Sequence, residues 1–354
     1  MTSITTLSDE AVGLLKLLIA CPSVSKQEQG SAGIIESFFF ERGIQAKRHL
    51  NNVWAVNKHY DANKKTILLN SHHDTVKPNS SYTLNPFDPI MKEGKLYGLG
   101  SNDAGGCLVS LALTFIHFYH HQGLKYNLLF AATAEEEISG ENGMEAVLTL
   151  IDNIDCAIVG EPTLMDAAIA EKGLMVLDCM TLGVSGHAAR EEGQNAIYKA
   201  IKDIAWIKNF KFPKVSELLG SVKMSVTQIE AGSQHNVVPD CCRFTIDVRV
   251  NEHYTLEEIL TIIKQNINCE VIPRSLRLRS SNIPKEHPLV KAALKSGSNY
   301  FGSATLSDKA LMPFPALKIG PGDSARSHTA DEFIYTVEIE NGIRAYIEIL
   351  NQLL

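Results

Sequence analysis

The sequence lacks the features that mark several classes of protein. No window approaches the roughly 18 consecutive apolar residues that a membrane-spanning helix needs. There is no basic run, and basic and aromatic residues are not interleaved as they are in nucleic-acid-binding segments. Acidic residues (40) outnumber lysine and arginine (33), which gives a formal net charge of -7. We therefore expect neither a membrane nor a nucleic acid as a partner, and predict a small-molecule or peptide substrate.

The cysteines show no disulfide pattern, and the N-terminus carries no signal-peptide pattern. The seven cysteines are odd in number and have no repeated spacing, which indicates reduced thiols rather than a disulfide framework. The first ten residues lack the basic start and apolar stretch of a secretory signal. These absences predict a cytoplasmic protein. Its 354 residues, 45% of them hydrophobic, are enough for two domains.

Helical and strand patterns alternate in the first part of the chain. Apolar runs predict buried strands at Thr66–Asn70, Asn127–Thr133 and Cys156–Val159. Apolar residues at helical spacing predict helices at Ser8–Ala20, Gly30–Arg42 and Gly106–His121. Such alternation is typical of an α/β fold, so we predict a mainly parallel sheet flanked by helices on both faces.

From about residue 172 the order becomes strand, helix, strand, strand, helix, strand, which is the order of a ferredoxin-like α+β unit. These segments are residues 174–184, 195–210, 221–229, 242–250, 255–265 and 268–279. After Pro284 the first pattern returns, with a strand at Ala316–Ile319 and a closing helix at Thr336–Leu353. We therefore predict a main domain of residues 1–171 and 284–354 that encloses an inserted domain of residues 172–283.

Metal-ligand residues follow the predicted strands of the main domain. A glycine-rich turn adds a further carboxylate just before the helix at 106–121. Because ligands bind outside the carboxyl ends of strands in an open α/β sheet, these side chains should meet in one crevice. They are His72, Asp74, Asp103, the triplet Glu135-Glu136-Glu137, Glu161 and His328. Singly, each could be a loop, turn or helix-terminal residue, and the triplet could be a solvated acidic loop.

The glutamate triplet indicates what the crevice binds. Three adjacent carboxylates repel one another unless a cation or a proton compensates them. Histidine and carboxylate ligands without cysteine suit zinc, cobalt or manganese, and a carboxylate that bridges two ions would explain the excess of acidic residues. The residues together therefore predict a two-metal site.

The ordered motifs resemble the zinc-dependent aminoacylase and metallopeptidase family of acetylornithine deacetylase, succinyl-diaminopimelate desuccinylase and glutamate carboxypeptidase. The resemblance covers essentially the whole chain. It rests on Ser-His72-His-Asp74-Thr-Val, Tyr-Gly-Leu-Gly-Ser-Asn-Asp103, Thr-Ala-Glu-Glu136-Glu137, Gly-Glu161-Pro-Thr, Gly-Val-Ser-Gly-His187, Asn236-Val-Val-Pro and Ser-His328-Thr-Ala-Asp-Glu. The segments Glu171-Lys172-Gly173-Leu-Met-Val and Gly-His187-Ala-Ala-Arg190 are most similar to the acetylornithine deacetylase branch.

The resemblance implies a role for each motif residue. Two zinc ions, replaceable by cobalt or manganese, would be bound by His72 with Glu161, by Glu137 with His328, and by Asp103 as the bridge. Glu136 would be the general base, and Asp74 would fix the ring of the ligand histidine. His187 would reach the active site of the partner subunit in a homodimer, although it could also be a surface histidine. Asn236 and Arg249 would contact substrate, although Arg249 could equally form a structural ion pair.

Two positions depart from the family pattern. Glu135 stands where relatives usually have aspartate, and its role stays open. Gly105 stands where many relatives have lysine, which changes the charge around the site.

The reaction implied is hydrolysis of an N-acyl group from an N-acyl amino acid. N-acetyl- or N-succinyl-ornithine in arginine biosynthesis is the first expectation, with N-acylcitrulline and N-acetyl-lysine as close competitors. A dipeptidase or carboxypeptidase would use the same site. A binding protein without activity is disfavoured, because a decayed enzyme should have lost ligands or the base.

Overall fold

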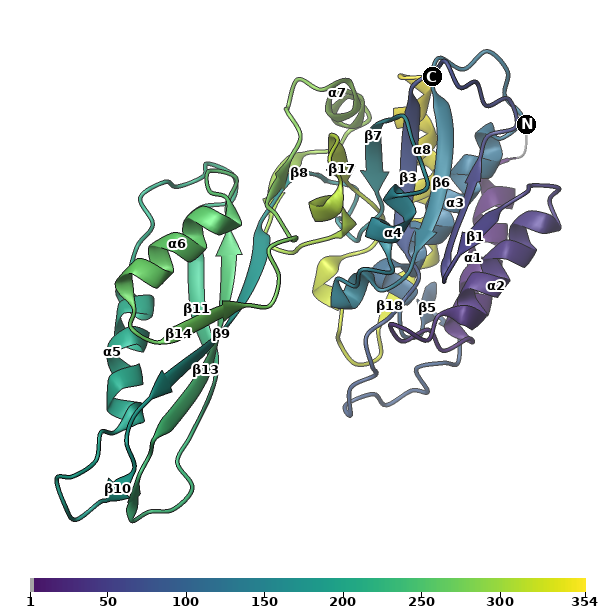
Figure 1. Cartoon of the computed structure of the whole chain (residues 1–354). Helices are drawn as coiled ribbons and strands as arrows, with labels where there is room; N and C mark the ends of the chain where they lie inside the picture. The colour runs from purple at the N-terminus through teal and green to yellow at the C-terminus, as the bar shows by residue number, and fades with distance from the viewer. Residues whose placement is uncertain (1–2) are drawn as a thin grey trace. The chain divides into compact units, whose positions relative to one another are not determined.

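The computed structural model describes residues 3–354, which separate into two compact units (Figure 1). The main unit contains the chain up to Ile169, Ile283–Phe301 and Ser307–Leu354. The inserted unit contains Ala170–Asn282 and Gly302–Leu306. The boundaries predicted from the sequence lie within two residues of 169/170 and 282/283. The short segment 302–306, which was predicted to belong to the main domain, groups with the inserted unit.

A mixed, mostly parallel sheet forms the centre of the main unit, and this confirms the predicted fold class. Its strands are ordered β1-β2-β6-β3-β7-β17-β8-β15, and β16 also pairs with β8. Strand β3 is parallel to β6 and β7, and β17 is parallel to β7, whereas β1, β2 and β8 are antiparallel to their neighbours. The strands are β1 (Lys47–His49), β2 (Asn52–Val56), β3 (Thr66–His72), β6 (Asn127–Thr133), β7 (Ile154–Val159), β8 (Ala167–Glu171) and β17 (Ala316–Lys318).

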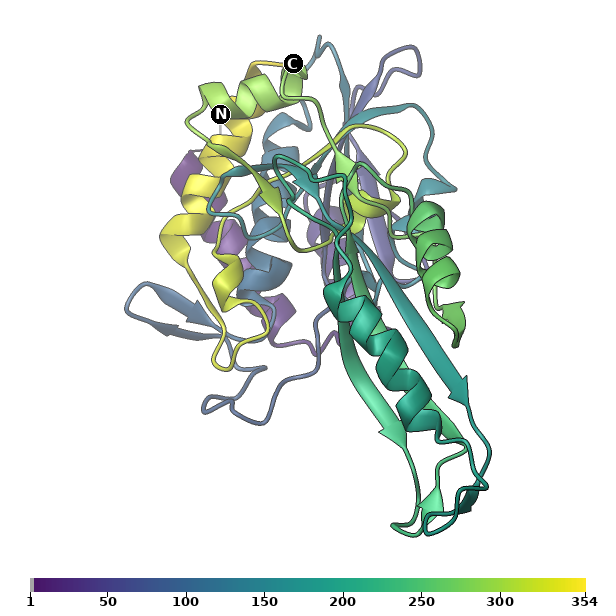
Figure 2. The ribbon, with the colours of Figure 1, turned by 90° about the vertical axis from the view of Figure 1, so that its left-hand side faces the viewer.

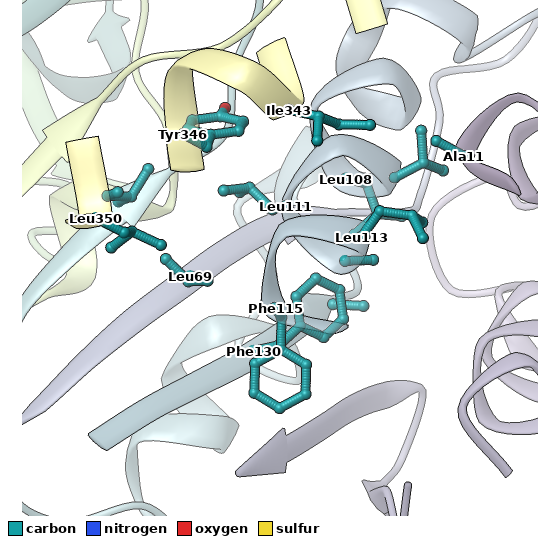
Figure 3. Close-up of a cluster of buried hydrophobic side chains, with 14 of the residues drawn as sticks. Ala11, Leu69, Leu108, Leu111, Leu113, Phe115, Phe130, Ile343, Tyr346 and Leu350 are labelled. Atoms are coloured by element: carbon teal, nitrogen blue, oxygen red, sulfur yellow. The ribbon is translucent and has the colours of Figure 1, made fainter. Parts of the chain in front are cut away.

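Helices cover the two faces of this sheet unequally. One face carries the larger core, where Leu69 and Phe130 of the strands pack with Phe115 and Tyr346 (Figure 3). The helices of this face are α1 (Ile4–Ile19), α2 (Gln29–Phe40), α3 (Gly106–Phe118), α7 (Pro288–Lys295) and α8 (Thr336–Asn351). The other face has a smaller core that includes the short helix α4 (Met144–Leu148). Burial on both faces explains why the strands read as continuous apolar runs.

Some predicted element ends were wrong. Helix α1 begins at Ile4, where the Ser3 hydroxyl accepts the Thr6 N–H at 3.1 Å, so the predicted N-cap Ser8 lies buried inside the helix. Helix α3 ends at Phe118 rather than residue 121. The strand predicted over 268–279 is confined to Glu270–Pro273. Within residues 3–354, none of the helices combines the length and apolar character that crossing a bilayer requires.

A small sheet that the sequence patterns did not predict supports the glycine-rich turn. It consists of β4 (Ile90–Lys92), β5 (Lys95–Tyr97) and β18 (Phe333–Tyr335), in the order β18-β5-β4. Strand β18 pairs antiparallel with β5, so the chain just before β18 meets the turn that follows β5. This contact brings Glu332 to the segment that carries Asp103.

The inserted unit has the predicted ferredoxin-like order. Its sheet is fully antiparallel with strand order β11-β13-β9-β14. Helices α5 and α6 lie along this sheet in both views of the ribbon (Figures 1 and 2). The elements are β9 (Gly173–Leu182), α5 (Ala196–Asn209), β11 (Lys223–Ala231), β13 (Cys241–Val250), α6 (Leu256–Asn266) and β14 (Glu270–Pro273). A two-stranded ribbon is added by β10 (Gly186–His187) and β12 (Val237–Val238). The short strands β15 (Ser281–Asn282) and β16 (Tyr300–Ser303) instead pair with β8 of the mixed sheet.

Candidate metal centre

The carboxyl ends of the central strands bring the predicted ligand residues of the main unit together. His72 is the last residue of β3, and β6 leads through two residues into the 3₁₀ turn Glu136–Ile138. Glu161 follows β7. Asp103 lies in the turn Ser101–Gly105, and His328 follows the 3₁₀ turn Ser324–Arg326. Parallel strands place these chain ends at one edge of the sheet, as in other open α/β folds.

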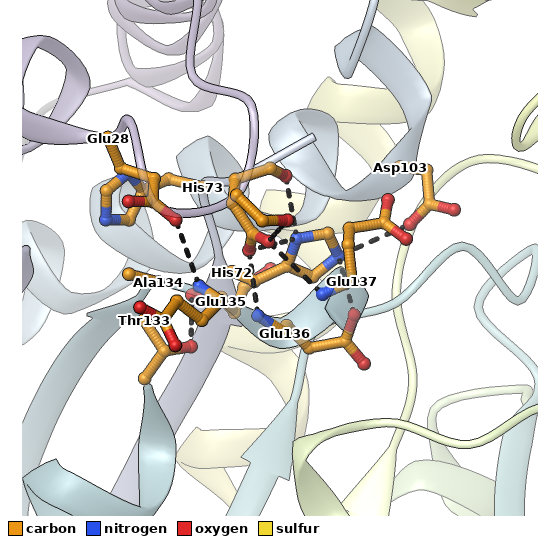
Figure 4. A network of polar contacts seen from close by, with 12 residues as sticks. Glu28, His72, His73, Asp103, Thr133, Ala134, Glu135, Glu136 and Glu137 are labelled. Carbon is orange, nitrogen blue, oxygen red and sulfur yellow. Dashed lines mark hydrogen bonds and ion pairs between the residues drawn. The ribbon is translucent and has the colours of Figure 1, made fainter. Parts of the chain in front are cut away.

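His72 is buried against three carboxylates. Its Nε2 atom lies 3.4 Å from Asp103 Oδ1, 3.7 Å from Glu161 Oε1 and 3.9 Å from Glu136 Oε2. This nitrogen has no hydrogen-bond partner among residues 3–354, although buried polar atoms nearly always have one. Figure 4 shows the His72 ring between Asp103 and Glu136. An imidazole nitrogen and carboxylate oxygens that face one another in this way form a donor set suited to a divalent cation.

Asp103 connects this group to a second one. Its Oδ1 faces His72, while its Oδ2 lies 3.5 Å from His328 Nε2. The same His328 nitrogen lies 3.0 Å from Glu137 Oε2. Single ligand atoms of His72, Asp103 and Glu137, and likewise of His72, Glu136 and Glu161, lie within 4.8 Å of one another. The donor set of imidazole nitrogens and carboxylate oxygens fits two divalent ions that share one bridging carboxylate.

The charges of the site shift the pKa values of its own groups. Burial acts to lower the pKa of His72, but Glu136, Asp103, Asp74 and Glu161 outweigh it and raise that pKa well above the ordinary value. Burial, followed by the Glu161 carboxylate, raises the pKa of Glu136 well above its usual range. The Glu137 carboxylate raises the pKa of His328 to about 9. These shifts reflect burial and the concentration of carboxylates at one place.

Asp74 connects the first histidine to the glutamate turn. The His72 Nδ1 atom is 3.0 Å from the backbone oxygen of Asp74 and 3.4 Å from its carboxylate Oδ1. The two carboxylate oxygens accept the N–H groups of Glu136 at 3.1 Å and Glu137 at 3.2 Å. The Ser25 hydroxyl also donates to Asp74 Oδ2 at 2.7 Å. Asp74 therefore sets the backbone of the glutamate turn as well as facing the histidine ring.

The turn that carries Asp103 is held by Glu332, to which the sequence reasoning gave no role. Its carboxylate accepts the N–H groups of Gly100 at 3.0 Å, Asn102 at 2.8 Å and Asp103 at 2.9 Å. Burial and the nearby Asp103 charge raise the pKa of Glu332 to about 8. The motif Ser-His328-Thr-Ala-Asp-Glu contained the residue, but only the pairing of β18 with β5 places it against the turn.

Glycines shape the same turn. Gly100 has φ 74°, a left-handed conformation that glycine adopts without strain. At Gly105, where many relatives have lysine, a Cβ atom would collide with the Gly100 carbonyl and lie 2.6 Å from Leu15 Cδ1. The local packing thus leaves no room for a side chain at position 105.

A second missed residue, Asp308, lies behind the site. It is 4% exposed, and its Oδ2 accepts the Thr133 hydroxyl at 2.6 Å. The Asn70 amide in turn donates to the Thr133 hydroxyl oxygen at 2.9 Å. Burial raises the pKa of Asp308 to about 6. Asp308 comes from a 3₁₀ turn, Asp308–Leu311, that no sequence pattern predicted.

His73 and Glu135 point away from the ligand group. The His73 ring lies between Ser31 Oγ and the Asn51 carbonyl, each 2.8 Å from a ring nitrogen, and burial lowers its pKa to about 4. The Glu135 carboxylate accepts the Asn142 amide at 3.1 Å. Figure 4 places His73 and Asp103 on opposite sides of the glutamate turn. Neither His73 nor Glu135 joins the two ligand groups.

The other predicted residues belong to the inserted unit. His187 in β10 pairs with Val237 in β12, so His187 and Asn236 lie on one exposed ribbon. The guanidinium of Arg249 makes two hydrogen bonds to the Asp247 carboxylate, at 2.9 and 3.0 Å. This ion pair agrees with the structural alternative for Arg249.

Comparison with known sequences identifies a family. Residues 68–352 match peptidase family M20/M25/M40. The chain is 25% identical to an acetylornithine deacetylase from Edwardsiella ictaluri over 359 residues, covering 92% of this chain and 93% of the relative. It is also 25% identical to succinyl-diaminopimelate desuccinylase 2 from a Ruegeria species over 279 residues, covering 73% and 69%.

Solved structures share the fold over nearly the whole chain. The aminopeptidase PepT from Bacillus cereus superimposes with a TM-score of 0.80 at 18% identity, covering 98% of each chain. A Bacillus subtilis protein described as a dinuclear metal-binding peptidase of the M20 family superimposes with a TM-score of 0.74 at 14% identity, also covering 98% of each. These similarities confirm the resemblance read from the motifs.

Proposed function

The chain belongs to peptidase family M20/M25/M40, and from this we propose that it is a dinuclear zinc amidohydrolase acting on N-acyl amino acids. The observation that carries the proposal is the buried, unpartnered His72 Nε2 atom, surrounded by carboxylates and linked through Asp103 to His328. The proposed ligands are His72 and Glu161 for one ion, Glu137 and His328 for the other, and Asp103 for both. Cobalt or manganese could replace zinc at such ligands.

The proposed reaction is hydrolysis of an amide bond. Bound divalent ions would polarise the amide carbonyl and acidify a water molecule. Glu136 lies within the carboxylate group around His72, and it occupies the middle position of the acidic triplet, where the family has its general base. Glu136 would take the proton of that water and return it to the departing amine. Asp74 and Glu332 hold the backbone on which Glu136, Glu137 and Asp103 stand.

The proposed substrate is N-acetyl- or N-succinyl-ornithine, which would place the enzyme in arginine biosynthesis. The relative from Edwardsiella ictaluri, an acetylornithine deacetylase, supports this choice because the match extends over 92% of this chain. The desuccinylase from Ruegeria makes N-succinyl-diaminopimelate a further substrate to compare. The seven free thiols support a cytoplasmic location.

We further propose that the enzyme is a homodimer in which His187 of one subunit completes the site of the other. His187 is exposed on the β10–β12 ribbon, where it can reach another molecule. Its role would be to donate to the oxyanion that develops on the amide carbonyl. Asn236, on the same ribbon, would contact the polar end of the substrate.

A substrate panel tests the function. Purified protein loaded with zinc or cobalt should be assayed with N-acetyl-ornithine, N-succinyl-ornithine, N-acylcitrulline, N-acetyl-lysine, N-succinyl-diaminopimelate and dipeptides. The proposal predicts the highest kcat/KM for an acyl-ornithine. A preference for dipeptides would indicate a dipeptidase instead. If the protein hydrolyses none of these compounds, the proposed function is wrong.

A further inference from the structure

The backbone of the glutamate triplet is strained at its first residue. Glu135 has φ 56° and ψ 19°, a left-handed conformation that non-glycine residues seldom adopt. Ser139, which ends the turn, is also left-handed, with φ 50°. The turn between them carries Glu136 and Glu137 at the site. Because strain of this kind relaxes unless neighbours oppose it, the contacts of this turn determine where both carboxylates point.

Three successive N–H groups of the triplet each point at a carboxylate. The Glu135 N–H donates to Glu28 Oε1 at 3.3 Å, and those of Glu136 and Glu137 donate to Asp74. Figure 4 shows Glu28 beside Glu135, on the side of the turn away from Asp103. The carboxylates of Glu28 and Asp74 therefore hold the turn from two directions.

The Glu28 carboxylate is held in place as a hydrogen-bond acceptor. It is 0% exposed, and its Oε1 also accepts the Lys26 N–H at 2.7 Å, while its Oε2 accepts the Asn51 amide at 2.8 Å. The nearby Ser25 hydroxyl donates to Asp74. The loop before α2 thus supplies one of the two carboxylates that hold the glutamate turn, Glu28, and contacts the other, Asp74, through Ser25.

The side chain of Glu135 completes this arrangement. Its Oε1 accepts the Asn142 amide at 3.1 Å, and its backbone oxygen accepts the Gly140 N–H at 2.8 Å. A Cβ atom at position 140 would lie 2.6 Å from Glu135 Cβ, so glycine there leaves room for the folded-back side chain. Glu135 faces this supporting side of the turn, which gives a purpose to the one glutamate that the motif left without a role.

We infer that Glu28 is a positioning residue, which acts through the backbone of Glu135 to aim Glu136 and Glu137 at the reacting atoms. This inference rests on the proposed function for its effect on catalysis. The contact between Glu28 and Glu135 exists independently of the substrate, so the positioning role of Glu28 and the proposed function can be tested separately.

The test compares three variants with the wild type. Glu28→Ala removes the acceptor, whereas Glu28→Gln keeps one oxygen for the Lys26 and Glu135 N–H groups. Ile35→Ala, in the same helix region and 1% exposed, loses core packing without touching the turn. It serves as the control for a general loss of stability. If Glu28→Ala does not fold, Glu28→Asp is used in its stead, because its side chain is one methylene shorter and its carboxylate lies farther from the Glu135 N–H.

Two measurements are needed. Hydrogen exchange of the metal-free protein, resolved at the Glu135 amide, should be at least tenfold faster in Glu28→Ala than in the wild type and unchanged in Ile35→Ala. On any substrate that the wild type hydrolyses, Glu28→Ala should lower kcat about tenfold or more with KM changed less than twofold, and Glu28→Gln should stay within threefold of the wild type.

Unchanged exchange at Glu135, or a fall in kcat no larger than that of Ile35→Ala at equal thermal stability, would overturn the inference. If the wild type hydrolyses nothing in the substrate panel, the proposed function fails. The exchange measurement would still decide whether Glu28 holds the turn.

Discussion

At neutral and higher pH, replacing Asp308 by asparagine should make the metal-free protein more stable than the wild type. In acid this advantage should be lost. The Asp308 carboxyl is buried behind the site and accepts the Thr133 hydroxyl. Asparagine has nearly the same shape and can still accept that hydroxyl, so the substitution mainly removes the charge. Any gain in stability should therefore follow the ionisation of Asp308.

The magnitude follows from the pKa. Burial raises the pKa of Asp308 from 3.8 to about 6. Because the folded-state pKa is the higher one, the stability that Asp308 contributes is fully present below pH 3.8 and is lost as the pH rises through 6. A pKa difference of about 2 between the folded and unfolded states corresponds to about 3 kcal/mol. The asparagine side chain of the variant has no carboxyl proton to lose, so the variant avoids this loss.

Urea unfolding of chelator-treated protein at pH 4 and pH 8 would measure the effect. Between these two values Asp308→Asn should gain roughly 2 kcal/mol relative to the wild type. Asp152→Asn, which removes an exposed carboxyl before β7, is the control and should show no such gain. Adding zinc should reduce the difference, because bound cations offset the carboxylate charge. A stability difference between variant and wild type that is the same at both pH values would show that the ionisation of Asp308 does not affect folding.

Three other predictions concern the metals and the active site. Metal analysis of the purified protein should give about two ions per chain, and a chelated protein that kept full activity would contradict the two-metal site. Glu136→Gln should retain metal but lose turnover on the order of 10²–10⁴-fold, and near-normal turnover would mean that the base is misassigned. Mixing inactive Glu136→Gln and His187→Ala proteins under demonstrated subunit exchange should restore some activity, because one site of each hybrid regains both groups. No recovery would argue against a shared site.

Much of the fold could be read from local patterns. The apolar runs of β3, β6 and β7 stand out because strands buried on both faces need no polar alternation. The order of elements in the inserted unit was also predictable, since each has its own period or cap, such as the capping box of Thr255 and Glu258 at α6. The small β4-β5-β18 sheet could not be predicted, because its three-residue strands are too short to show a period.

The candidate ligands could be predicted for a similar reason. His72 and Glu161 directly follow apolar strands, and the parallel arrangement carries such positions to one edge. The supporting carboxylates Glu28, Asp308 and Glu332 carry no comparable signal. They come from a loop, a 3₁₀ turn and the residue before a short strand, far along the chain from the residues they hold.

Residue types and spacings along the chain were enough to predict the order of strands and helices, the candidate ligand residues and the resemblance to a metal-dependent family. The family motif already separated Glu136 and Glu137 from Glu135, but the physical cause of that separation, and the carboxylates that hold the turn, are visible in the tertiary structure alone. Glu135, Glu136 and Glu137 are identical in type and adjacent in sequence. The left-handed turn and the acceptors Glu28 and Asp74 send the first away from the site and the next two into it. That distinction depends on contacts between distant segments, which no local pattern encodes.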